Sequence, residues 1–159
     1  MKRVIIREAD QIDCNDVFDW RNDPLSIEMS HQSEQVSWNE HLVWYNDSLK
    51  DPSRAMFICE DPASNSKVGI VRYDLLDNSC TVSINLAPDM RGKGFSAICL
   101  TGSIDFVRKQ FPHIKVINAT IKSSNIKSQK SFSRAGFVFK EKSGDTKLYT
   151  FANNSMNVT

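Results

Sequence analysis

The sequence lacks a long apolar run, an excess of charge of one sign and any pair of closely spaced cysteines. Its N-terminal apolar run extends only from Val4 to Ile6, which is far too short for a signal peptide or a membrane span. Twenty basic residues stand against nineteen acidic ones, so the formal net charge is +1. Because no general basic field surrounds the chain, we expect neither a nucleic acid nor a membrane among its partners.

The four cysteines are scattered along the chain, at Cys14, Cys59, Cys80 and Cys99. No CxxC pair occurs, which argues against a zinc site or a redox pair, and we expect no metal. The last three lie in apolar segments and are expected to be small buried hydrophobic residues in a reducing cytoplasm. Cys80 and Cys99 have no nearby histidine in the sequence, so covalent catalysis through either thiol is not favoured.

What is present is the composition of one globular domain, with 40% hydrophobic and 25% charged residues in 159. We expect this domain to span residues 1–152, with a polar tail at 153–159. Periodicity and turn residues predict strands at 2–8, 55–60, 68–73, 80–86, 114–121, 137–140 and 147–151. They predict helices at 13–21, from 37, at 96–111 and at 124–136. This order predicts an α/β (α+β) domain with a mixed, mostly antiparallel, seven-stranded sheet and about four helices.

Three local signals set the expected helix boundaries. Ser37 and Glu40 form a capping-box pattern, which predicts a helix that starts after Ser37. Pro24 either ends the first helix or starts a turn. Gly136 is expected at the C-terminal cap of the last helix.

The stretch APDMRGKGFSAICL, residues 87–100, joins a predicted strand to a predicted helix. Gly92 and Gly94 allow a tight turn and a close approach by a ligand. The first amides of the helix have no internal partners and carry the positive end of the helix dipole, so a pyrophosphate is their natural ligand. Arg91 and Lys93 would add cations at the rim. The stretch matches neither GxxxxGK[ST] nor GxGxxG, and a plain glycine turn is the alternative.

Arg91-x-x-Gly94-x-Ser96 resembles the acetyl-CoA loop of the GNAT family, the Gcn5-related N-acetyltransferases. The serine replaces the usual glycine or alanine, but it is small and able to cap the helix. The stretch SNIKSQKSFSRAGF resembles a second family pattern through Asn125, Ser128, Phe132, Gly136 and Phe137. The order of the predicted elements is also similar along almost the whole chain.

This resemblance implies a GNAT fold in which the fourth and fifth strands splay apart, and acetyl-CoA as the cofactor. It assigns cofactor binding to Leu86, Arg91, Gly92, Lys93, Gly94, Phe95, Ser96, Asn125, Ser128 and Phe132. It also implies direct attack by a primary amine in a ternary complex, with the backbone amide near Asn85 or Leu86 polarising the thioester carbonyl.

The acid and the base of this reaction stay open in the sequence. Phe132 stands where many GNAT enzymes have a tyrosine acid, and Ser128 is a poor acid. The coenzyme A thiol is acidic enough for water to suffice. For the base, a water held by Ser83, His31 or Glu28 would be enough.

Two stretches, DWRNDPLSIEMS and VSWNEHLVWYNDSL, resemble nucleotide-sugar acetyltransferases, closest to those that acetylate UDP-linked 4-amino sugars in pseudaminic acid biosynthesis. The matching residues are Trp20, Arg21, Asn22, Asp23, Pro24, Ser37, Glu40, His41 and Trp44. We therefore expect a UDP-amino sugar as the acceptor, bound by Arg21, Asn22, His31, His41, Trp44, Arg72 and Tyr73.

Several alternatives remain at this point. Trp20 and Trp44 are equally suited to the core, His41 to a structural role, and Arg21 to an ion pair with Asp19 or Asp23. At the level of function, the alternatives are a ribosomal-protein or peptide N-terminal acetyltransferase and a non-catalytic acyl-CoA-binding module. The chain is expected to be a monomer or a homodimer that pairs through the edge of its terminal hairpin.

Overall fold

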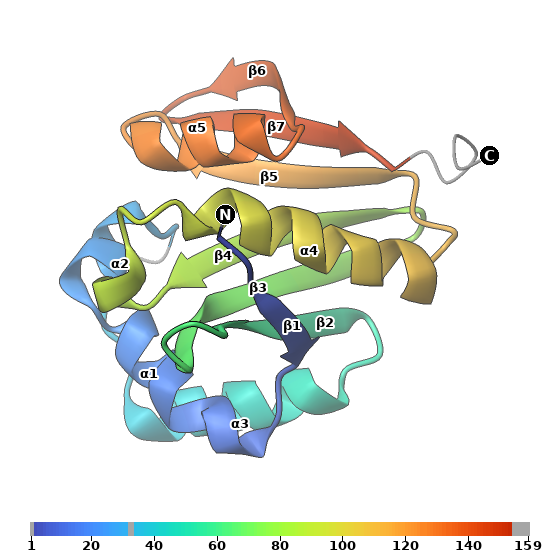
Figure 1. Ribbon diagram of the computed structural model, residues 1–159. Coiled ribbons are helices and arrows are strands. Elements are labelled where there is room, and N and C mark those ends of the chain that lie inside the picture. The colour runs from blue at the N-terminus through green and yellow to red at the C-terminus, as the bar shows by residue number, and fades with distance from the viewer. Residues whose placement is uncertain (1, 32–33, 154–159) are drawn as a thin grey trace.

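The computed structural model describes residues 2–31 and 34–153 and contains one seven-stranded sheet (Figure 1). In chain order the strands are β1 (Ile5–Glu8), β2 (Arg54–Asp61), β3 (Ser66–Leu76), β4 (Ser79–Leu86), β5 (Val116–Lys122), β6 (Val138–Ser143) and β7 (Thr146–Ala152). Across the sheet their order is β1-β2-β3-β4-β5-β7-β6. Every neighbouring pair is antiparallel except β4–β5, which is parallel. The predicted mixed, mostly antiparallel sheet is confirmed.

The helices are α1 (Cys14–Arg21), α2 (Pro24–Met29), α3 (Trp38–Lys50), α4 (Phe95–Gln110) and α5 (Ile126–Arg134), with short 3-10 turns η1 (Gln11–Asp13) and η2 (Pro88–Met90). The Ser37 hydroxyl accepts from the Glu40 amide at 3.2 Å, as the cap predicted for α3 requires. Gly136 follows α5 with a φ of 100°, the left-handed conformation that glycine favours.

Helix α2 was not predicted as a helix, because Pro24 was interpreted as a stop or a turn. Pro24 instead occupies the first helical position, where its missing N–H costs nothing. Asp23 caps α2 by accepting from the amides of Leu25 and Ser26. The element order predicted from the sequence therefore lacks this helix.

The two faces of the sheet carry different helices. On one face, the Tyr73 hydroxyl of β3 hydrogen-bonds the Ser103 hydroxyl of α4 at 2.7 Å, and α4 lies across β3 and β4 with α5 beside it (Figure 1). On the other face, Arg72 lies against Trp44 of α3. Neighbouring residues of β3 therefore point to opposite layers, as the strand period of two requires.

β4 and β5 pair only at their beginnings, where Ser79–Thr81 lies beside Val116–Asn118. Beyond these residues, β4 continues to Leu86 and β5 continues to Lys122 without pairing to each other. The predicted splay between the fourth and fifth strands is thereby confirmed.

The remaining predictions on organisation have mixed outcomes. All four cysteines are buried and unpaired, as expected for the three in apolar segments. Asn153, which we placed in the polar tail, is buried and donates to the Ile114 carbonyl at 2.7 Å, so the ordered domain includes it. The rest of the predicted tail lies outside the described residues. In the described part of the chain, no helix has the length and apolar character that a membrane crossing requires.

Candidate active site

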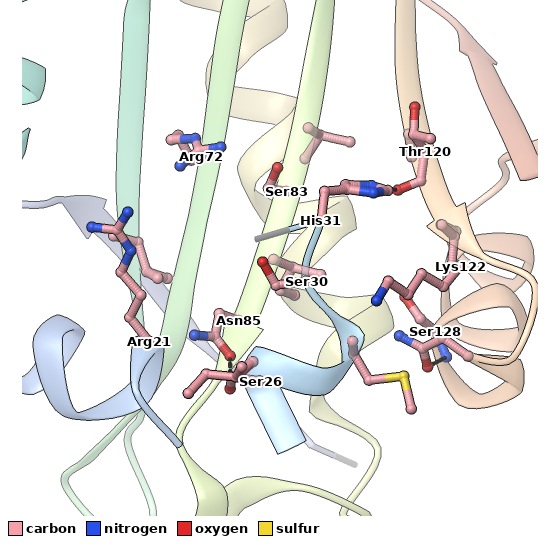
Figure 2. Close-up of a pocket in the computed structure, with 18 of the residues that line it drawn as sticks. Arg21, Ser26, Ser30, His31, Arg72, Ser83, Asn85, Thr120, Lys122 and Ser128 are labelled. Carbon is pink, nitrogen blue, oxygen red and sulfur yellow. Dashed lines mark hydrogen bonds between the residues drawn. The ribbon is translucent and has the colours of Figure 1, made fainter. Parts of the chain in front are cut away.

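A pocket of about 520 Å³ opens at the splay between β4 and β5, and α1, α2, α3 and α5 contribute further walls (Figure 2). This volume suits a small-molecule ligand. Of the predicted site residues, those that line the pocket are Arg21, His31, Trp44, Arg72, Ser83, Asn85, Asn125, Ser128 and Phe132. Tertiary structure therefore brings together residues that lie more than a hundred positions apart in the sequence.

The backbone at the end of β4 presents an amide toward the splay. The Ala87 amide donates to the Val68 carbonyl of β3 at 2.8 Å. In an antiparallel ladder the amides alternate in direction, so Asn85 also turns its N–H toward β3 and Leu86 turns its N–H toward β5. Because β5 does not pair with β4 at this level, the Leu86 amide is available to a ligand in the splay.

The glycine-rich loop has the geometry of an anion-binding turn. Gly92 and Gly94 have φ values of 73° and 82°, and a Cβ added at Gly92 would meet no atom within 4 Å. Gly94 is the N-cap of α4 and provides no side-chain cap, so the first amides of this 16-residue helix face outward. An open backbone at a helix N-terminus fits the pyrophosphate of acetyl-CoA. Ser96 lies inside the helix, so our expectation that it caps the helix is wrong.

The Arg91 guanidinium is not available as an unpaired cation at the rim of this loop, because three protein groups already accept hydrogen bonds from it. Its guanidinium donates to Asp23 at 2.6 Å, to the Ser26 hydroxyl at 2.7 Å and to the Leu86 carbonyl at 3.3 Å. Ser26 in turn donates to the Asn85 side chain at 2.9 Å. The hydrogen bond from Arg91 holds the pKa of Asp23 below its usual range. Arg91 therefore ties the loop and the end of β4 to α2.

The Arg91→Met and Asp23→Asn variants test this connection. Each change is expected to lower the free energy of unfolding by about 1–2 kcal/mol, because each breaks the partly buried, charge-assisted hydrogen bond between Arg91 and Asp23. Arg91→Met also removes the hydrogen bonds to Ser26 and Leu86, so its effect should be the larger one. The double variant should lose no more than the larger single effect, because both changes break the same contact. Denaturant unfolding measures all three, with Lys93→Met as the exposed neighbouring control. Fully additive losses would contradict the connection.

The end of α2 and the residues that follow it contact β5. Lys122 donates to the Glu28 carbonyl at 2.8 Å, and the His31 ring Nε2 lies 3.1 Å from the Thr120 carbonyl. Figure 2 shows His31 reaching across the pocket toward Thr120. This places His31, but not the exposed Glu28 side chain, at the wall of the pocket.

Arg21 is held at the opposite side of the pocket by aromatic rings. Its guanidinium lies 4.5 Å from the centre of the Trp44 ring, and its Nη1 lies 3.4 Å from His41 Nδ1. His41 Nε2 lies 3.0 Å from the Cys14 carbonyl, to which it donates. Burial lowers the pKa of His41, which is consistent with a neutral ring that donates through Nε2 and accepts through Nδ1.

Three predicted acceptor contacts do not reach the pocket. Tyr73 is fully buried on the α4 face, so the expectation that it binds the acceptor is wrong. His41 is fully buried behind Arg21, so it positions that side chain instead of touching a ligand. Asn22 uses its side-chain amide to bridge the backbone N–H and C=O of Val36, both at 2.8 Å, and so fixes a loop.

The α5 residues form the remaining wall. The Asn125 side chain caps α5 by accepting from the Ser128 amide at 3.2 Å. Phe132 is buried, and its ring packs edge-on against Phe137 with centroids 5.0 Å apart. Phe132 therefore helps to shape the wall of the pocket, but its phenyl ring has no acidic proton to donate to a leaving thiolate.

The site residues predicted from the sequence do not include Lys2, Ser26, Arg54, Thr120 or Lys122. Ser26, Arg54, Thr120 and Lys122 line the pocket, and the Lys2 ammonium lies 4.6 Å from the Phe95 ring, beside the glycine-rich loop. Arg54 stands opposite Asp74 in the β2–β3 ladder, a pairing that strand register sets and that no local sequence pattern reveals.

A splayed mixed sheet with an anion-binding loop at the end of β4 fits an acyltransferase that uses a coenzyme A thioester. The model of the acetyltransferase (GNAT) domain matches residues 3–138, and the chain belongs to this family. It is therefore an acetyl-CoA-dependent N-acetyltransferase, and the predicted fold, enzyme class and cofactor are confirmed. A comparison with curated proteins finds no match.

Solved structures share this fold at low sequence identity. A domain from Methanocaldococcus jannaschii DSM 2661 superimposes with a TM-score of 0.82 at 23% identity, covering 96% of this chain and 99% of that one. Spermidine N-acetyltransferase from Vibrio cholerae, in complex with CoA and spermine, gives 0.80 at 20% identity, covering 94% and 95%. Aminoglycoside acetyltransferase AAC(6')-Ib, with coenzyme A and kanamycin, gives 0.79 at 14% identity, covering 94% and 95%.

Proposed function

We propose that the chain transfers the acetyl group of acetyl-CoA to the 4-amino group of a UDP-linked amino-deoxy sugar. The observation that carries this proposal is the convergence of the two WRNDP and EHxxW stretches on one wall of the pocket. Arg21 from the first stretch is stacked on Trp44 from the second, and His41 supports it from behind. Asp23 from the first stretch anchors α2 to Arg91, beside the loop assigned to the cofactor.

The charge of the pocket supports an anionic acceptor over a polycationic one. Arg21, Arg54, Arg72 and Lys122 all line it, whereas Glu34 is the acidic residue among the described lining residues. A polyamine or an aminoglycoside would meet like charge at this wall, and a sugar diphosphate would meet opposite charge. Nearby cations also lower the pKa of an acceptor ammonium, which favours the neutral amine that attacks.

The residues of the pocket would have the following roles in acetyl transfer. When bound, acetyl-CoA would supply the thioester carbonyl that the amine attacks. The Leu86 amide would donate to the carbonyl oxygen as its negative charge develops. Ser83 and His31 would hold the water that accepts the proton of the amine. Phe132 has no acidic proton to donate, so protonation of the departing thiolate would be left to solvent.

The test is thiol release from acetyl-CoA with a panel of acceptors. The panel contains a UDP-4-amino-4,6-dideoxy sugar, the same sugar without the nucleotide, spermidine and N-terminal peptides. Release with the UDP-linked sugar, at least tenfold faster in kcat/KM than with the other acceptors, is the expected result. Preferential release with peptides or with spermidine would overturn the proposal, as would binding of acetyl-CoA with no release across the whole panel.

A further inference from the structure

Three guanidiniums surround one indole ring at the acceptor end of the pocket. The Arg21, Arg54 and Arg72 guanidinium carbons lie 4.5, 5.7 and 5.5 Å from the centre of the Trp44 ring. They come from α1, β2 and β3, while Trp44 comes from α3. All four residues line the pocket, and we call them the arginine cluster.

Two guanidiniums of the arginine cluster share a single carboxylate among the described residues. Asp74 accepts from Arg54 at 2.6 Å and from Arg72 at 3.2 Å, so one carboxylate serves two guanidiniums. Glu40 attracts Arg21 from the exposed surface of α3. Burial and the repulsion from the neighbouring Arg72 guanidinium both lower the pKa of Arg21. An anion at this place would relieve that repulsion.

The arginines are also oriented to bind an anion. A guanidinium stacked on an aromatic ring keeps its N–H groups in its own plane, which is the direction from which a phosphate accepts. Arg72 hydrogen-bonds Asp74 through Nε, and its two terminal nitrogens make no hydrogen bond to any described residue. The Trp44 ring contacts all three guanidiniums and so holds the arginines in place.

The distance from the reaction centre is suitable for an amino sugar. Arg72 stands opposite Ser83 in the β3–β4 ladder. Asn85, two residues further along β4, lies about 7 Å from Ser83 and next to the Leu86 amide. An interval of this length would hold a single sugar ring, with its amine toward Leu86 and its anomeric substituent toward the arginine cluster.

We propose that the arginine cluster is a binding subsite for the diphosphate of the acceptor. The inference rests on the proposed function, because it assigns the diphosphate of that nucleotide sugar to Arg21, Arg54 and Arg72. It adds that the charge of the phosphates, and not the sugar alone, selects the acceptor. Recognition should weaken as salt rises, because the contacts are electrostatic.

Binding of UDP and of inorganic pyrophosphate to the full chain, measured by calorimetry, tests the subsite without any acetyl transfer. Arg72→Gln and Arg21→Gln are each expected to weaken UDP binding at least tenfold. Lys140→Gln, on the exposed strand β6, removes the same charge and should leave binding unchanged. Arg72→Lys should recover only part of the affinity, because lysine keeps the charge and loses the planar fork. Circular dichroism verifies that each variant is folded.

The outcomes separate the subsite from the proposed function. If UDP fails to bind at about 1 mM, or binds equally well to the Gln variants, the subsite is wrong. If a UDP-amino sugar is acetylated and the Gln variants have the same KM for it as the wild type, the proposed function is supported and the subsite is wrong. If UDP binding depends on the arginines but no UDP-amino sugar is acetylated, the subsite is supported and the proposed acceptor is wrong.

Discussion

Replacing Leu86 with proline is expected to lower kcat for acetyl transfer by about 10²–10³-fold, the cost of losing one oxyanion donor. Proline removes the backbone N–H of residue 86 and nothing else from the chemistry. That N–H points to β5, away from the β3–β4 ladder, so the sheet keeps its own hydrogen bonds. Steady-state kinetics with the acceptor identified in the panel measure the effect.

Leu86→Ala is the matched control for this experiment, because it removes the side chain and keeps the amide. It should retain kcat within a few-fold. Both variants must bind acetyl-CoA and unfold cooperatively, so that a loss of activity reports on the amide alone. If the proline variant turned over as fast as the alanine variant, Leu86 would have no role as an oxyanion donor.

Replacing Asp13 with asparagine is expected to lower the free energy of unfolding by about 3 kcal/mol. Asp13 is fully buried and accepts from two Arg7 nitrogens, each at 2.8 Å, and from Lys67 at 2.8 Å. The Asp10 amide also donates to it, at 3.0 Å. The carboxylate thus joins β1, η1 and β3, and its loss leaves two cations without their shared partner.

Asp16→Asn is the matched control, because Asp16 also pairs with Lys67 at 2.8 Å but is about half exposed. Its loss should cost less than about 1 kcal/mol. Denaturant unfolding at neutral pH compares the two variants. Equal losses would contradict the central place of Asp13 in this cluster.

The same cluster predicts how stability depends on pH. Burial alone would raise the pKa of Asp13, but the hydrogen bonds from Arg7 and Lys67 outweigh it and hold the pKa well below the ordinary 3.8. A carboxyl whose pKa is lowered in the folded state stabilises the fold above its unfolded pKa and loses this contribution as pH falls. The difference between the wild type and Asp13→Asn should therefore shrink below about pH 4. A difference that stayed constant to about pH 3 would exclude this assignment.

Local sequence signals predicted the features that depend on a few neighbouring residues. The cap at Ser37, the left-handed Gly136 and the tight turn at Gly92 and Gly94 all follow from local backbone preferences, which tertiary contacts did not override. Helix α2 was missed because the same proline that stops one helix can start the next.

Side-chain roles were harder to predict, because they depend on which layer a residue faces. Arg72 and Tyr73 are consecutive in β3, yet one lines the pocket and the other is buried under α4. Arg91 matched the family motif by position, but its partner is Asp23, 68 residues earlier in the chain. His41 had two open interpretations, an acceptor contact and a structural role, and its full burial behind Arg21 favours the structural role.

The sequence by itself determined the order of the strands and of the helices other than α2, the turn at the end of β4 and, through its motifs, the family. These follow from short-range periodicity, from glycine conformation and from residues at fixed spacing. Only the tertiary structure decided that the Leu86 amide faces the splay, that Arg91 anchors α2, and that three arginines gather around Trp44. Each of these depends on strand register and layer packing, which bring distant residues together and which no local pattern specifies.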